Sequence, residues 1–175
     1  MPHIIHIFGA SGSGTTTLAR EISARFGYFH MDTDDYFWLP TDPMFTIKRD
    51  KAERLALMKK DIATHEKIVL SGSLCDWGDD LIPCFDLVIR VVTDTQTRLE
   101  RLKAREYRRF GNRICKGDDM YEEHIKFLTW ASEYDTGDIT MRSKMKHDAW
   151  QKRLSCPVIT VNGTNDIESI IKEIF

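Results

Sequence analysis

The sequence predicts an α/β fold in which a parallel sheet carries helices on both faces. Short apolar runs alternate with longer stretches of helical periodicity along the whole chain, and this alternation is typical of βαβ units. The run over 85–92 is rich in β-branched residues, as a strand buried in a parallel sheet should be. A length of 175 residues suits one domain with a sizeable core. We therefore expect a single α/β domain over residues 1–175.

Each predicted element follows from its local pattern. Glycine or polar residues end the apolar runs, and apolar residues three and four apart mark the helices. We expect strands over 3–8, 28–31, 68–70, 85–92 and 158–161. We expect helices over about 14–26, 50–65, 94–110, 120–134, 139–153 and 167–174. The insert between the fourth and fifth strands is longer than a simple crossover helix, which suggests a lid.

The composition is that of an ordinary soluble globular protein, with 42% hydrophobic and 30% charged residues. A formal net charge of −2 argues against a general nucleic-acid or membrane binder, so local clusters must bind any anion. No basic and apolar leader precedes the first strand, and no apolar run could span a bilayer, so we expect neither signal peptide nor membrane segment. The cysteines lack zinc-ligand spacing and should stay reduced in a cytoplasmic enzyme; they are Cys75, Cys84, Cys115 and Cys156.

The segment from Gly9 to Thr17 is the most specific motif in the chain. It nearly matches G-x-x-x-x-G-K-[ST], in which backbone N–H groups at a helix N-terminus cradle phosphates. Gly9 and Gly14 are the fixed glycines, Thr16 is the hydroxyl on the magnesium side, and Thr15 stands where the motif has lysine. Because the cradle depends on backbone amides, phosphate binding does not require the lysine; the alternative is a turn that binds nothing. The residues expected around the phosphates are Gly9, Ser11, Gly12, Ser13, Gly14, Thr15, Thr16 and Thr17.

Asp32, Asp34 and Asp35 follow the second predicted strand. Three carboxylates within four residues repel one another unless cations or hydrogen-bond donors compensate. Beside a phosphate loop, one can hold Mg²⁺ and another can accept a proton from the attacking group. We expect Thr16 and Asp32 on the metal side and Asp34 as the catalytic group on the acceptor side. A turn or helix cap is the alternative, since aspartate is favoured there too.

Arginines form a stripe along the helix predicted after the fourth strand. They fall three and four residues apart, and more follow near the end of the helix: Arg98, Arg101, Arg105, Arg108, Arg109 and Arg113. A solvated face is the alternative, but phosphoryl transfer needs cations around the equatorial oxygens, and arginine supplies planar donors. We assign catalytic roles to Arg105, Arg109 and Arg113, which lie nearest the proposed lid hinge.

Residues from two strand-end loops could bind the acceptor. Arg49 lies in a basic cluster after the aspartates and could hold an anionic group, or it could belong to a solvated helix start. Trp38 and Trp77 could stack on a planar substrate, although aromatic residues more often belong to the core. Together with Asp34, the substrate residues we expect are Asp35, Trp38, Arg49, Ser71, Gly72, Ser73 and Trp77.

On these residues, the chain resembles the P-loop small-molecule kinases, which include nucleoside monophosphate kinases and the shikimate and gluconate kinase group. A lysine-free Gly-Ser-Gly-Thr-Thr-Thr loop is similar to that of some archaeal-type cytidylate kinases. Asp32-Thr33-Asp34 resembles the Asp-x-Asp of shikimate and gluconate kinases. The adenylate kinase Asp-Gly-Phe-Pro-Arg is here Ser71-Gly72-Ser73-Leu74-Cys75, which argues against an orthodox adenylate kinase.

The resemblance implies a three-layer P-loop NTPase fold with a five-stranded parallel sheet in the order 2-3-1-4-5. It also implies a helical lid over about 108–147 and an acceptor-binding region over about 34–66. Asn162 and Gly163 lie where these enzymes place the loop against the adenine base. ATP and Mg²⁺ are the implied cofactors.

The sequence thus favours an ATP-dependent phosphotransferase acting on a small molecule, for which a nucleoside monophosphate is one candidate. The alternative is a nucleotide-binding regulatory or partner-binding protein without transfer activity, which the missing lysine favours. The expected partners are a nucleotide and a small-molecule acceptor, with neither nucleic acid nor membrane. The pattern does not define the acceptor or the oligomeric state.

Overall fold

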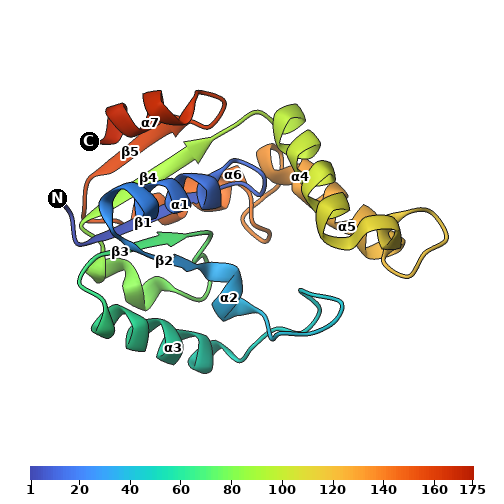
Figure 1. The fold of residues 1–175 in the computed structure, drawn as a ribbon, viewed down its shortest axis with the longest axis horizontal. Coiled ribbons are helices and arrows are strands. Elements are labelled where there is room, and N and C mark those ends of the chain that lie inside the picture. Colours follow the sequence, from blue (N-terminus) through green and yellow to red (C-terminus); the bar gives the residue numbers. More distant parts are fainter.

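The computed structural model describes residues 1–175 and contains one five-stranded parallel sheet in the order β2-β3-β1-β4-β5. Strand β1 (Ile4–Gly9) is central, between β3 (Ile68–Ser71) and β4 (Leu87–Val92). Strands β2 (Phe29–Asp32) and β5 (Val158–Asn162) form the edges. The predicted α/β class and strand order are therefore confirmed, and all five strands end at the same edge of the sheet (Figure 1).

Helices cover both faces of the sheet. Helices α1 (Thr15–Phe26) and α7 (Ile167–Ile174) pack on one face, in a core cluster with residues of β1, β4 and β5. The other face is covered by α3 (Lys51–Thr64), α6 (Lys144–Gln151) and the 3₁₀ helix η1 (Asp79–Cys84). The sheet is thus the middle of three layers. No helix combines the length and the apolar composition that a bilayer crossing requires.

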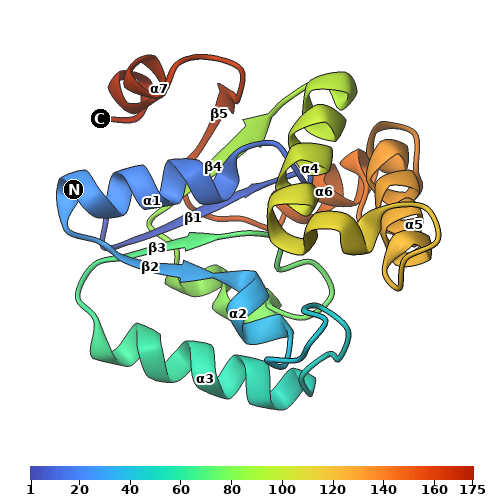
Figure 2. The ribbon, with the colours of Figure 1, turned by 45° about the vertical axis from the view of Figure 1, so that its right-hand side comes forward.

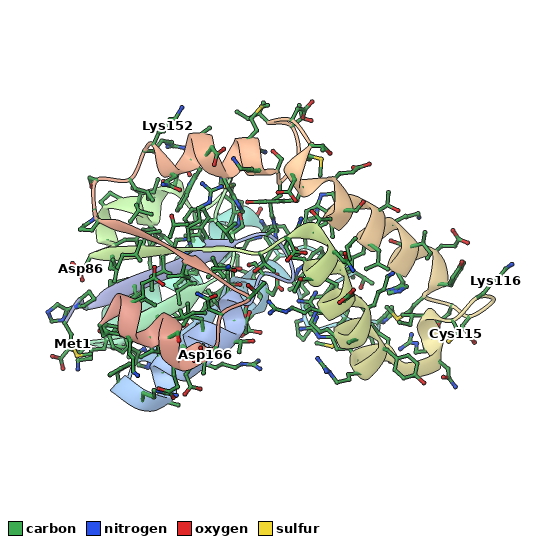
Figure 3. All side chains as sticks on the ribbon, turned by 90° about the horizontal axis from the view of Figure 1, so that it is seen from above. Met1, Asp86, Cys115, Lys116, Lys152 and Asp166 are labelled. Carbon is green, nitrogen blue, oxygen red and sulfur yellow. The ribbon has the colours of Figure 1, made fainter.

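A helical arm extends from the carboxyl end of the sheet. It consists of α4 (Thr95–Phe110), η2 (Gly111–Ile114), α5 (Tyr121–Ser132) and η3 (Glu133–Asp135). Figure 2 shows the arm across from the loop that follows α2 (Thr33–Phe37). In the view from above, Cys115 and Lys116 mark its far tip (Figure 3).

Two stretches differ from the sequence-based expectation, and capping explains both. Helix α2 begins directly after β2, because the Asp32 carboxylate accepts a hydrogen bond from the Asp34 backbone N–H at 3.1 Å. The helix expected from residue 139 begins only at Lys144. Ser143 caps it by accepting from the Lys146 N–H at 3.1 Å, after a turn closed by Asp138 and Thr140.

Arg98 fixes the arm to the sheet and is fully buried. Its guanidinium donates to the carbonyls of Thr93 and Ala131, each at 3.1 Å, and to the Asp135 carboxylate at 2.8 Å. It also lies over the ring of Tyr134, 5.0 Å from the centroid. Although Arg98 belongs to the arginine stripe in sequence, its donors serve the structure of the arm and not a ligand.

Replacing Arg98 with Leu should lower the free energy of unfolding by about 3 kcal/mol, because several hydrogen bonds to a buried charged group are lost together. Chemical denaturation measures the change. Lys103→Ala, an exposed position on the same helix, is the control and should stay within about 0.5 kcal/mol of the wild type. Equal unfolding midpoints for Arg98→Leu and the wild type would contradict this role.

Candidate functional site

The loop between β1 and α1 has the backbone geometry of a phosphate cradle. Gly12 and Gly14 have φ angles of 81° and 108°, values that residues with a Cβ atom disfavour. Gly14 is the N-cap of α1, and no side chain caps the helix there. The N–H groups of the first turn are therefore left for an anion, which the helix N-terminus favours electrostatically.

Ser13 joins this loop to the ends of β4 and β5. Its carbonyl accepts from the Thr93 hydroxyl at 3.0 Å and from Arg101 Nη1 at 3.3 Å. A Cβ on Gly9 would lie 2.4 Å from the Val91 carbonyl oxygen, and one on Gly163 would lie 2.3 Å from that of Ser13. Both glycines are thus required by close backbone approach.

A cavity of about 730 Å³ opens in front of the loop. It brings together residues from the loop, β2, α4 and the turn after β5, as the sequence predicts for ligands at the carboxyl edge of the sheet. The residues that line it include Gly12, Ser13, Gly14, Thr15, Thr16, Thr17, Arg20, Asp32, Arg101, Arg105, Arg108, Arg109 and Gly163. Apart from Asp32, the charged residues are all arginines.

Five predicted nucleotide or catalytic residues do not line this cavity: Gly9, Ser11, Asp34, Arg113 and Asn162. The Asn162 side chain instead accepts from the Thr164 backbone N–H at 3.0 Å. The Arg113 guanidinium is occupied by ion pairs with Asp119 at 2.7 Å and Asp42 at 2.9 Å. Arg113 therefore links the arm to the loop after α2, in contrast to the phosphate-facing position expected from the sequence.

Thr16 in the first turn of α1 contacts Asp32 at the end of β2. The Thr16 hydroxyl donates to Asp32 Oδ2 at 3.0 Å, so the two predicted metal-side oxygens are adjacent. No cluster of three or more histidine, cysteine or acidic side chains is positioned to hold a metal. Such a sparse oxygen set fits Mg²⁺, which keeps several waters and is bound by one or two carboxylates together with substrate phosphates.

The Asp34 carboxyl is influenced by the charges of three arginines. Its side chain reaches solvent but is surrounded by protein on most sides, and this burial raises the pKa of the carboxyl, as does the nearby charge of Asp32. The positive charges of Arg142, Arg105 and Arg109 oppose that rise in pKa. Burial and Asp32 also raise the pKa of Asp35, but the charges that oppose this rise are those of His30 and Arg20. Asp34 is thus the carboxylate on which Arg105, Arg109 and Arg142 act.

Arg142 is an arginine that acts on Asp34 and that the sequence did not single out. It lies in the turn before α6, half-buried, with its guanidinium 5.2 Å from the centre of the Trp130 ring. Burial lowers its pKa, and the charges of Asp34, Cys75 and Tyr134 oppose this. No carboxylate lies within ion-pair distance of Arg142. Nothing in its sequence neighbourhood distinguishes it from an ordinary basic turn residue.

The structure corrects two predicted acceptor residues. Trp77 is buried, belongs to the hydrophobic core beneath α3, and donates its indole N–H to the Ser73 carbonyl at 3.1 Å. Arg49 donates to the Tyr36 carbonyl at 2.9 Å and pairs with Glu53 at 2.7 Å. The ring of Trp77 and the guanidinium of Arg49 are therefore used by the fold. Trp38 remains half-buried, in edge-on contact with Phe37 and Phe45.

The loop after β3 shapes the site but offers few free groups. Ser71 Oγ lies 2.9 Å from His30 Nε2, and Ser73 Oγ lies 3.1 Å from His147 Nε2. A Cβ on Gly72 would lie 1.8 Å from the Thr33 hydroxyl oxygen. Gly72 thus allows the end of β3 to approach Thr33 of α2 closely, while the hydroxyls of Ser71 and Ser73 already have histidine partners.

Replacing Asp34 with Asn should raise the melting temperature near pH 7. Because the pKa of Asp34 is raised in the folded protein, ionising its carboxyl favours the unfolded chain once the pH exceeds the ordinary value of about 3.9. The gain should therefore be full above the folded pKa and vanish below the unfolded one. Thermal melts over about pH 4 to 8, with Asp118→Asn as an exposed control, measure it. A lower melting temperature than the wild type near pH 7 would contradict this assignment.

Comparison with known sequences places the chain in a family. The model of an AAA domain family, AAA_18, matches residues 5–125. The uncharacterized protein YqaC of Bacillus subtilis (strain 168) is 46% identical over 157 residues, covering 90% of this chain and 86% of that protein. A cytidylate kinase of Methanocorpusculum labreanum is 28% identical over 118 residues, covering 58% of this chain and 62% of the kinase.

Solved structures share the fold at low identity. A shikimate kinase from Bacteroides thetaiotaomicron gives a TM-score of 0.58 at 19% identity, covering 99% of this chain and 97% of that one. A gluconokinase from Sinorhizobium meliloti gives 0.53 at 16% identity, covering 98% and 89%. The chain belongs to the AAA_18 family of AAA domains, and its fold is that of the P-loop small-molecule kinases.

Proposed function

We propose that this protein is an ATP-dependent phosphotransferase that phosphorylates a small hydroxylated molecule, for which a nucleoside monophosphate is one candidate. The observation that carries the proposal is the cavity of about 730 Å³, which joins the phosphate loop, the Thr16–Asp32 pair and the arginines of α4. The cytidylate kinase relative and the kinases that share the fold support the same class of reaction.

The donor nucleotide occupies this cavity in the proposal. Backbone amides of residues 11–16 bind the β-phosphate region, and the turn at Asn162 and Gly163 faces the adenine base through Gly163, which lines the cavity. Arg101 donates to the carbonyls of Ser13 and Gly163, at 3.3 and 3.0 Å, and so ties the phosphate side of the cavity to the base side. Thr16 and Asp32 would hold Mg²⁺, which when bound neutralises charge on the phosphates.

Asp34 orients the acceptor hydroxyl and accepts its proton. Its raised pKa supports this role, because a carboxylate that is less acidic than usual is a better base. Arg142 lies close enough to Asp34 to affect its pKa and has no carboxylate partner. We therefore propose that the acceptor carries an anionic group, a carboxylate or a phosphate, which Arg142 binds.

Arg105 and Arg109 replace the charge that lysine would provide at position 15. Both line the cavity, and both share Glu106, with nitrogen–oxygen distances of 3.6 and 3.8 Å. Such long contacts leave donors free for phosphate oxygens. In this proposal residues of about 108–147 form a lid whose closure excludes water, and about 34–66 form the acceptor-binding region.

The second candidate is a nucleotide-binding regulatory protein without transfer activity. The observations that favour it are Thr15 in place of lysine and Ser71 in place of the aspartate that follows the third strand in adenylate kinases. A screen distinguishes the two: melting temperatures are measured with Mg-ADP and hydroxylated carboxylates or phosphate esters, since a ligand of the folded state raises apparent stability. Hits are then tested with Mg-ATP for a phosphorylated product. Nucleotide binding without any product would favour the regulatory protein.

We expect the Arg105→Ala and Arg109→Ala substitutions each to lower kcat for phosphoryl transfer by roughly 100-fold. Each substitution removes a charged hydrogen-bond donor that would stabilise the transition state. Lys103→Ala, exposed on the same helix, should keep wild-type turnover. Initial rates at saturating Mg-ATP and acceptor measure the effect. Wild-type turnover in both arginine variants would contradict their role.

Replacing Thr15 with Lys should preserve or strengthen nucleotide binding, because it restores a cation beside phosphates that the backbone already holds. Calorimetric titration with Mg-ATP measures the affinity. Abolished binding in a variant that still melts cooperatively would show that the loop is not built as a phosphate cradle.

A further inference from the structure

Two aromatic side chains of α5 connect two arginines of the proposed active site. The rings of Phe127 and Trp130 are stacked at 28°, with 6.0 Å between centroids. The Arg105 guanidinium lies 5.9 Å from the centre of the Phe127 ring, and the Arg142 guanidinium lies 5.2 Å from that of Trp130. An arginine of α4 and an arginine of the turn before α6 are thus joined through one helix of the arm.

This contact holds the arginines without using their hydrogen-bond donors. An aromatic face attracts a guanidinium through its π electrons, while the N–H groups at the edge of the guanidinium stay free. Arg142 has no ion pair, and the carboxylate contact of Arg105 is the 3.6 Å approach to Glu106. The Nε of Arg105 is buried without a hydrogen-bond partner. Both guanidinium groups therefore have donors left for an anion.

The negative charge of one carboxylate also acts on both arginines. The charge of Asp34 opposes the lowering of pKa that burial causes in Arg105 and in Arg142. Arg109 also acts on Asp34 but has a different aromatic partner, because its guanidinium lies 5.1 Å from the ring of Phe45, in the loop after α2. The aromatic pair on α5 thus acts on Arg105 and Arg142 and not on Arg109.

We infer that Phe127 and Trp130 are positioning residues that hold Arg105 and Arg142 at one shared anion site beside Asp34, where the phosphoryl group is received during transfer. This inference rests on the proposed function. It adds that the geometry of the site depends on two side chains of α5, which belong to neither hydrophobic cluster of the sheet. If α5 moves when the arm closes, the two arginines move with it as a unit.

The Phe127 and Trp130 side chains are not part of the hydrophobic core. Phe127 and Trp130 are only half-buried and belong to neither of the two core clusters. A purely structural role predicts that truncating Trp130 lowers stability and leaves ligand affinities unchanged, or weakens all of them alike. A positioning role predicts a selective loss at the shared anion site.

The test compares Trp130→Leu, which removes the aromatic face, with Trp130→Phe, which keeps one. Ile125→Ala, an exposed apolar residue of the same helix, is the matched control. Each full-length protein is titrated calorimetrically with Mg-ADP, and then with inorganic phosphate at saturating Mg-ADP, so that phosphate reports the shared anion site. We expect Trp130→Leu to weaken phosphate binding by roughly tenfold, the loss of one desolvated cation–π contact, with Mg-ADP affinity unchanged.

Trp130→Phe should recover phosphate affinity to within about threefold, since a smaller ring still attracts the guanidinium. Unchanged phosphate affinity in Trp130→Leu, or an equal loss for Mg-ADP and phosphate, would overturn the inference. So would a wild-type protein that binds Mg-ADP but not phosphate. A wild-type protein that fails to bind Mg-ADP would instead contradict the proposed function itself.

Discussion

The hydrogen bonds to the carbonyl of Ser13 are the contacts on which the site depends. Thr93 binds this carbonyl from the end of β4, and Arg101 binds it from α4 while also reaching the carbonyl of Gly163. One oxygen atom thus ties the phosphate loop to the sheet, to the arm and to the turn after β5. The glycines at 9 and 163 are needed because the backbones meet too closely for a Cβ. The shape of the donor cavity follows from this packing, and no side chain at position 15 takes part in it.

Because the loop has no lysine, the positive charges around the cavity all belong to arginines outside the loop. The arginines that line the cavity come from α1 and α4, and Arg142 comes from the turn after the arm. A lysine in the loop would be present whether the arm is open or closed. In the proposed mechanism, arginines on the arm would reach the phosphates only when the arm is closed, so the charge available to the transition state would depend on the position of the lid. This coupling is a physical reason why a loop without lysine is compatible with transfer and with slow loss of ATP to water.

The sequence was sufficient for the fold and for the geometry of the loop from Gly9 to Thr17, because both depend on short local patterns. The glycines at 9 and 14 and the β-branched strands define a loop and a sheet whose order the structure confirms. The acceptor side depends on contacts between distant segments. Trp77 was expected to stack on a planar substrate, but it belongs to the core cluster that includes Met58 of α3. Arg49 was expected to hold an anionic group, but it bonds to Tyr36 and Glu53. Arg142 could not be singled out from the sequence, because the groups that act on it are the Trp130 ring and the Asp34 carboxyl, and Asp34 is distant in sequence.

The most direct test of phosphotransferase activity is ³¹P NMR of Mg-ATP incubated with the protein and a mixture of hydroxylated carboxylates and phosphate esters. Phosphotransferase activity predicts that the γ-phosphate signal falls while ADP and a new phosphate ester signal grow together. The Asp34→Asn protein should bind Mg-ATP and produce no ester. Saturating nucleotide binding in the wild-type protein with no ester formed, or with inorganic phosphate as the sole product, would contradict the account.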